Sequence, residues 1–247
     1  MTTHVLPGAD GGAGYRSGAM VPIISFMATL KLGAFADNLH GRAGNTVFVR
    51  SAGGVVVREH VIPRDPQTEL QMAARLRLMR AGIAWNELEP EQAERWRDYA
   101  LRIGVREPGT GAVRARRAQN VFCGLACKLL QAVPNATIPL DPPDAPFFGD
   151  AISISVQPAP SALDFDASAP NQPTVLTELL VQPLRHGAMR PKAAAYRSKA
   201  FVTYAPGSLR YTLSLSPGWY AAAYRFVQRH TGEESPLVPL GVVRVMA

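Results

Sequence analysis

The spacing of hydrophobic positions divides the chain into a β-rich start, a helical middle and a β-rich end. Near the start, valines recur at every second position on both sides of a Ser-Ala-Gly-Gly run: Val47, Val49, Val55 and Val57. Alternation of this kind is typical of strands, and the small residues between the two runs tolerate the positive φ of a tight turn. The pattern predicts a small β-hairpin unit over residues 27–62.

The middle of the chain repeats apolar residues at the spacing of helices. Thr68 and Gln71 fit a capping box at the start of a first helix that reaches Trp85. Pro90 suits the first turn of a second helix, and a third is expected over residues 114–133. Together they predict a three-helix bundle over residues 63–134, whose core holds four aromatic side chains: Trp85, Trp96, Tyr99 and Phe122.

After the bundle, the sequence becomes rich in proline and then shows short runs in which apolar and polar residues alternate. Residues 135–150 are proline-rich and predict a stiff linker. Beyond it, strands are expected at 152–156, 175–181, 194–204, 209–215, 219–229 and 240–245, the spacing of a β-sandwich. The predicted fold is therefore multidomain α+β, with a β-hairpin unit, a three-helix bundle and an immunoglobulin-like or fibronectin III-like sandwich over residues 151–247.

Composition gives limited information on the class of protein and on its location. Of the 247 residues, 47% are hydrophobic and 18% charged, as in ordinary globular proteins. No run approaches the roughly 20 apolar residues of a membrane span, and the chain shows no signal peptide. We expect a location in the cytoplasm of the producing cell or in a virion. Residues 1–26 are expected to be disordered or an extension, because Met27 opens a segment that resembles a natural start.

The residue types that carry catalysis are not arranged for it. The sequence has no phosphate-binding loop, no His-Glu-x-x-His motif and no Gly-x-Ser-x-Gly elbow. Cys123 and Cys127 stand four apart on a predicted helix, a spacing too wide for a disulfide and too poor in ligands for zinc. The sequence therefore predicts a protein that is not an enzyme and uses no metal or cofactor.

The formal net charge of +7 directs attention to two basic groups. The first lies at the expected start of the third helix, where cations oppose the helix dipole: Arg114, Arg116 and Arg117. The second has no acidic residue among its members: Arg185, Arg190, Lys192, Arg197 and Lys199. Either group is a candidate contact for an anionic partner. Alternatively, the second protects an edge strand from aggregation by its charge.

Several anchors recur in a fixed order along the first half of the chain. They are Gly41, Gly44, Asn45, Val47 and Phe48, then Pro63, Pro66, Gln67 and Thr68, then Trp85 and Leu88, and then Trp96, Tyr99 and Ala100. Through these anchors, residues 41–133 resemble an uncharacterised family of bacterial and phage-associated proteins. The resemblance implies an architecture and a setting but no mechanism.

Near the C-terminus, Trp219, Tyr220 and Tyr224 precede a Thr-Gly-Glu-Glu-Ser-Pro turn. This stretch resembles the last hairpin of fibronectin type III domains. The three aromatic residues also raise the possibility of a carbohydrate-binding module, but strand parity places Trp219 opposite the two tyrosines, so one set must belong to the core.

Two functions remain in view. The first is a non-enzymatic structural or assembly protein, such as a phage virion or prophage-encoded component, whose partners are other protein subunits in a homo-oligomer or larger assembly. The alternative is a nucleic-acid-binding protein, because the helical region faintly resembles an HMG box. The wedge residue and the long basic third helix of such boxes are missing.

Overall fold

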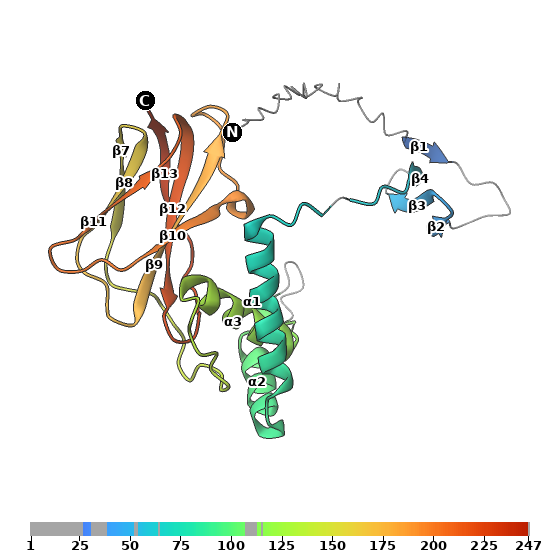
Figure 1. The fold of residues 1–247 in the computed structure, drawn as a ribbon, viewed down its shortest axis with the longest axis horizontal. Coiled ribbons are helices and arrows are strands. Elements are labelled where there is room, and N and C mark those ends of the chain that lie inside the picture. The colour runs from blue at the N-terminus through green and yellow to red at the C-terminus, as the bar shows by residue number, and fades with distance from the viewer. Residues whose placement is uncertain are drawn as a thin grey trace, which may run out of the picture. The chain divides into compact units, whose positions relative to one another are not determined.

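The computed structural model describes residues 27–30, 39–51, 54–63, 65–106, 113–114 and 116–246. The expected extension, residues 1–26, lies outside them. Three α-helices and several antiparallel sheets confirm the α+β class (Figure 1). The chain divides into two compact units, Met1–Pro66 and Gln67–Ala247, which are described separately.

The first unit contains a four-stranded antiparallel sheet of order β1-β4-β3-β2. Its strands are β1 (Met27–Leu30), β2 (Gly41–Ala43), β3 (Thr46–Ser51) and β4 (Gly54–Glu59). The predicted hairpin is confirmed, because β3 pairs with β4 so that Val49 lies opposite Val56. Strands β1 and β2 extend this hairpin on its two sides. Gly44 adopts a φ of 59° in the tight turn between β2 and β3, a conformation that suits glycine.

The second unit begins with α1 (Glu69–Asn86) and α2 (Pro90–Arg102), and continues to α3 (Ala118–Ala132). The predicted capping box is present: the Thr68 side chain accepts from the backbone N–H of Gln71, and the Gln71 side chain accepts from that of Thr68. Trp96 and Phe122 are each 1% exposed and meet edge-to-face, with ring centroids 5.1 Å apart. Tyr99 is also buried, whereas Trp85 is half-buried and contacts Phe122.

The third helix starts four residues later than expected, which is a correction to the sequence analysis. Val113 and Arg114 form strand β6 (Val113–Arg114), which pairs with β5 (Val105–Arg106). The extended backbone that this pairing requires excludes a helix at Arg114. The helix follows Arg117, whose backbone is still extended. Of the first basic group, none therefore lies within α3.

The rest of the second unit holds two antiparallel sheets, which we call the two-sheet region. One has the order β11-β8-β7 and the other the order β10-β9-β12-β13. The strands are β7 (Ile154–Ala159), β8 (Ala162–Ala167), β9 (Val175–Leu184), β10 (Arg197–Val202), β11 (Arg210–Ser214), β12 (Gly218–Gln228) and β13 (Val238–Val245). Phe165 of β8 packs in one core with Leu179 of β9 and Tyr224 of β12, so side chains from both sheets share the space between them.

The larger sheet is buried on its second face as well. Residues 175–182 of β9 are all buried, although alternate positions point away from the shared core. Glu178 on this outer face binds Lys128 of α3. Gln182 accepts a hydrogen bond from the backbone of Lys192, in the connection between β9 and β10. Helix α3 and this connection therefore cover the sheet, which explains why β9 has a continuous run of buried residues.

The proline-rich segment after α3 is held against the helices. The Trp96 indole Nε1 donates to the carbonyl of Leu140 at 2.8 Å, and Arg80 donates to the carbonyl of Pro134 at 2.9 Å. Further along, Phe147 packs against the shared core of the two sheets. The segment thus runs from the helices to the sheets with contacts to both.

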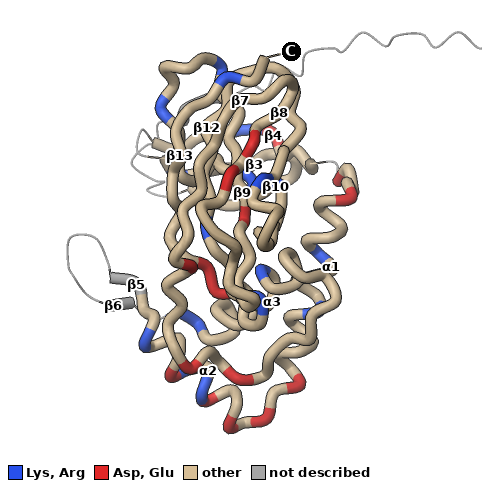
Figure 2. Tube along the Cα trace, turned by 90° about the vertical axis from the view of Figure 1, so that its left-hand side faces the viewer, with Lys and Arg blue, Asp and Glu red and all other residues tan. Residues whose placement is uncertain are grey.

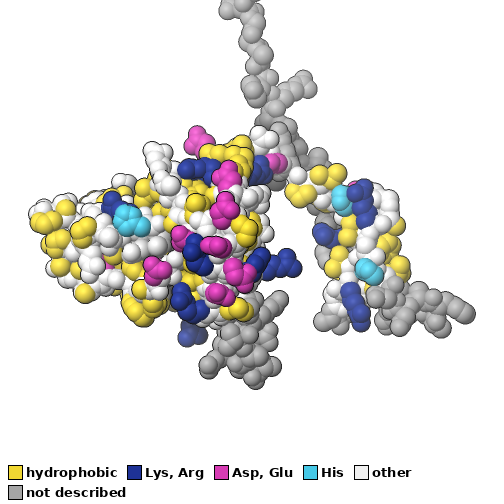
Figure 3. All heavy atoms as spheres, turned by 90° about the horizontal axis from the view of Figure 1, so that it is seen from below, with side chains coloured by type: hydrophobic (Ala, Val, Ile, Leu, Met, Phe, Trp, Pro, Cys, Tyr) yellow, Lys and Arg dark blue, Asp and Glu magenta, His cyan; other side chains and the backbone are white. Residues whose placement is uncertain are grey.

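Charged residues are unevenly distributed over this unit. Figure 2 shows acidic residues gathered around α2 and the turn before it. On the face seen in Figure 3, charges of both signs crowd the helical part, and few are visible over the two-sheet region. Across the residues that the structure describes, there is no helix with the length and apolar character needed to cross a membrane.

Candidate protein-interaction site

Helix α1 presents hydrophobic side chains on the side that faces away from the other helices. This outer stripe consists of Met72 (48% exposed), Leu76 (53%), Met79 (55%) and Ile83 (50%). The spacing of four, three and four residues is that of a coiled-coil seam. Ala81, which is fully buried, lies on the face that packs against the other helices. The outer stripe is therefore a second apolar face, which no described part of the chain covers.

A groove with a volume of about 680 Å³ runs between α1 and α3. Its apolar lining comes from Leu78, Ile103, Val121 and Leu125. At 3.6 residues per turn, Leu78 lies on a different side of α1 from the outer stripe.

The polar lining of the groove has a positive balance. It comprises Arg77, Arg116, Asn120, Lys128, Gln131 and Glu234. Lys128 and Glu234 bind each other at 2.6 Å. Arg77 and Arg116 form no ion pair with any residue in the described part of the chain. Their two charges are therefore available to a ligand.

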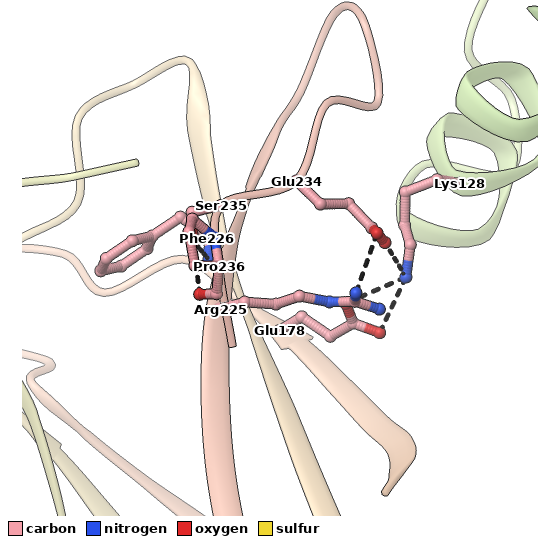
Figure 4. Close-up of polar contacts among 7 residues, drawn as sticks. All are labelled: Lys128, Glu178, Arg225, Phe226, Glu234, Ser235 and Pro236. Atoms are coloured by element: carbon pink, nitrogen blue, oxygen red, sulfur yellow. Dashed lines mark hydrogen bonds and ion pairs between the residues drawn. The ribbon is translucent and has the colours of Figure 1, made fainter. Parts of the chain in front are cut away.

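One wall of the groove is fixed by a buried ionic cluster (Figure 4). Glu178 is completely buried, and it accepts hydrogen bonds from Lys128 Nζ at 2.9 and 3.0 Å and from Arg225 Nε at 2.5 Å. Glu234 then binds both Lys128 and Arg225. Two acids and two bases from α3, β9, β12 and the β12–β13 connection thus balance one another.

The ionisation of Glu178 follows from these contacts. Burial opposes its charge, but the hydrogen bond from Arg225 and the charge of Lys128 outweigh burial, so the pKa of Glu178 lies below its ordinary value. The carboxylate is therefore charged at neutral pH. Because the whole cluster is internally paired, its role is to hold α3 on the sheet, and it offers no free group to a substrate.

The basic residues named from the sequence lie in three places. Arg116 lines the groove, Arg117 is exposed just before α3, and Arg114 lies in β6, where its side chain is outside the described atoms. The second group occupies the β9–β10 connection and β10, with all five side chains exposed: Arg185, Arg190, Lys192, Arg197 and Lys199. Strand β10 is an edge strand of its sheet, as the protective interpretation requires.

The aromatic residues near the C-terminus form no exposed platform. Tyr224 is 7% exposed within the shared core, and Tyr220 packs against that core. Trp219 points to the other face of the sheet, where its ring lies so close to Gly187 that a β-carbon there would be 2.6 Å from it. A carbohydrate-binding surface built from these three residues is therefore contradicted by their packing.

The thiols have the properties of packing residues. Cys123 and Cys127 are half-buried and not joined in a disulfide. Burial raises the pKa of both, which favours the unreactive thiol over the thiolate. Within the described ranges, no group of three or more His, Cys, Asp or Glu side chains is placed to hold a metal ion.

Met72, Leu76, Met79 and Ile83 recur at helical spacing in the sequence, but that spacing alone does not predict their exposure. The available signal was that α1 carries two apolar stripes, of which a small bundle can bury only one. The cluster around Glu178 had no such signal, because its members come from four separate segments. Comparison with known proteins gives no match: no family model, curated protein or solved structure matches the chain.

Proposed function

We propose that this chain is a non-enzymatic structural or assembly protein that acts through protein–protein contacts. The observation that carries the proposal is the outer stripe of α1. Four half-exposed apolar side chains in a coiled-coil spacing form an apolar strip on the order of a few hundred Å², a size that marks interaction sites on soluble proteins. A partner helix laid along the stripe would bury the half of each side chain that is now in water.

We further propose that the two-sheet region is a fibronectin III-like domain, which supports an assembly role. Its seven strands divide into a three-stranded and a four-stranded sheet, with the fourth strand, β10, at the edge beside β9. The Tyr220 hydroxyl, near the start of β12, donates to the Ser216 carbonyl at 2.9 Å. A tyrosine that bonds back to the preceding corner in this way is typical of immunoglobulin-like sandwiches. Fold does not by itself determine function, but such domains often mediate contacts between proteins.

The proposed setting is a phage particle or a prophage-encoded assembly. It is supported by the order of anchors over residues 41–133, which resembles bacterial and phage-associated proteins. The proposed partners are other copies of the chain or other subunits of the assembly.

The first experiment measures the mass of the full chain by light scattering at low and moderate salt. We expect a defined oligomer that persists as salt rises, because apolar burial is not screened. Replacing Leu76 and Met79 together by serine should reduce the mass. Replacing Leu101, which is 60% exposed on α2, by serine is the matched control and should not.

The same measurement with random-sequence duplex DNA tests the nucleic-acid alternative. A wild-type monomer that shifts onto DNA at low salt and is released steeply as salt rises would contradict the assembly proposal and support the alternative. An oligomer that keeps its mass in the double serine variant would show that the stripe is not the contact.

A further inference from the structure

The most exposed large hydrophobic side chain described in the structure lies in the proline-rich segment. Phe148 is 85% exposed, whereas its neighbour Phe147 packs against the shared core. Four residues earlier, Asp144 is exposed and forms no ion pair with any described residue. Phe148 and Asp144 thus present one aromatic ring and one exposed negative charge on a segment anchored on both sides.

The groove between α1 and α3 has the complementary properties. Leu78 and Leu125 give it an apolar lining, and Arg77 and Arg116 give it two positive charges that form no ion pair with a described residue. It is also open, since a β-carbon added at Gly124, which lines it, would meet nothing within 4 Å. A volume of about 680 Å³ exceeds that of a phenylalanine side chain several times and falls in the range of ligand pockets.

We propose that the groove of one copy receives Phe148 of a second copy, with Asp144 of that copy placed against Arg77 or Arg116. This inference rests on the proposed function, since it names a contact within the assembly. An aromatic side chain that fills an apolar pocket is the usual anchor of a protein interface, and a charge pair at the rim adds register.

The lining of the groove favours a protein segment over nucleic acid. Among the described residues, the lining contains no Phe, Tyr, Trp or His on which a base could stack. Two arginines beside an apolar wall also give a poor match to a phosphate backbone, which presents a continuous row of charges.

The ligand and its receptor lie on different parts of the same chain, which determines the kind of assembly. A contact between two different surfaces repeats from copy to copy, and it gives a ring when the rotation closes and a filament when it does not. The outer stripe, on another side of α1, would then provide a second and independent contact.

The contact can be isolated in a background that lacks the stripe, with Leu76 and Met79 replaced by serine. In this background we expect residual, concentration-dependent self-association by sedimentation. Phe148→Ala should weaken it by at least about 30-fold in Kd, the effect of removing an interface anchor. Gly124→Trp, which fills the groove, should also abolish it. Leu101→Ala is the control that removes an exposed side chain elsewhere and should have no effect.

Mixing the two defective proteins gives the decisive result. The Gly124→Trp variant keeps its Phe148, and the Phe148→Ala variant keeps its groove, so a mixture should form a one-to-one dimer that neither protein forms alone. Two monomers after mixing, or an unchanged mass for Phe148→Ala, would overturn the inference. A salt-resistant wild-type oligomer that dissociates with the serine pair alone would overturn it as well, while leaving the proposed function intact. A wild-type chain that is monomeric throughout would contradict both.

Discussion

Gly232 lies directly against the backbone of Leu125. A β-carbon at position 232 would stand 2.3 Å from the carbonyl oxygen of Leu125 and 2.8 Å from the nitrogen of Leu129. Gly232 also has a φ of 77°, a backbone conformation that residues other than glycine rarely adopt. The connection between β12 and β13 can therefore approach α3 this closely only because residue 232 is glycine, and this approach helps to join the helices to the two-sheet region.

Substitution of Gly232 by alanine should push the β12–β13 connection away from α3. We expect a loss of at least about 1–3 kcal/mol in the free energy of unfolding, from overpacking against helix backbone that cannot move aside. Chemical denaturation would measure it. Gly124→Ala is the matched control, because that position in α3 has open space and alanine favours helix. Equal stabilities of the two variants would show that the connection can move away from α3 without cost.

Replacing Lys128 by methionine should be more damaging than its position near the surface suggests. The substitution removes two hydrogen bonds and the neighbouring positive charge from the buried Glu178 carboxylate, which keeps its contacts with Arg225 and Ser198. Breaking a buried ion pair from one side costs about 3–5 kcal/mol. Denaturation of the Lys128→Met protein tests this. The exposed pair between Arg95 and Asp141 is the control, and Arg95→Met should leave stability nearly unchanged.

Acid should weaken the same junction. The pKa of Glu178 is lower in the folded protein than its ordinary value of 4.5, so the folded state binds this proton less readily than the unfolded state. The resulting stability is complete above about pH 4.5 and is lost as pH falls through the folded pKa. The slope of unfolding free energy against pH in this acidic window should be shallower in Glu178→Gln. If the two slopes are the same, other carboxylates control acid unfolding.

Features set by neighbouring residues were predictable, and features set by distant ones were not. The first helix begins where Thr68 and Gln71 indicate, because a capping box involves only four consecutive positions. Strand β8 was missing from the expected strands. The alternation of Asp164 and Asp166 left strand and loop both open, and these side chains are satisfied across the sheet, where Asp166 binds Arg210 at 2.6 Å.

The candidate site was less predictable from the sequence than the fold, because its residues lie far apart along the chain. Lys128 and Glu178 are 50 residues apart, and no local pattern pairs them. The exposure of Leu76 likewise depends on which face of α1 packs against the other helices. The periodicity of α1 gave both stripes, but only the tertiary structure shows that Ala81 lies on the covered one.

Alkaline pH should weaken the contact between α2 and the β12–β13 connection, because this contact involves the Tyr99 hydroxyl. Its hydroxyl donates to Glu233 at 3.1 Å, and burial together with the charge of Glu233 raises the pKa of Tyr99 from 10.0 to about 12. A raised pKa means that the folded state keeps the proton more tightly, so the associated stability is complete below pH 10.0 and is lost as pH rises toward about 12. Tyr99→Phe should cost about 1 kcal/mol at neutral pH, the value of one hydrogen bond. It should also flatten the decline in stability over this alkaline window, while buried Tyr204, whose pKa is raised as well, retains its own contribution. A Tyr99→Phe protein with the same alkaline decline as the wild type would show that the Tyr99 hydroxyl does not link α2 to the β12–β13 connection in solution.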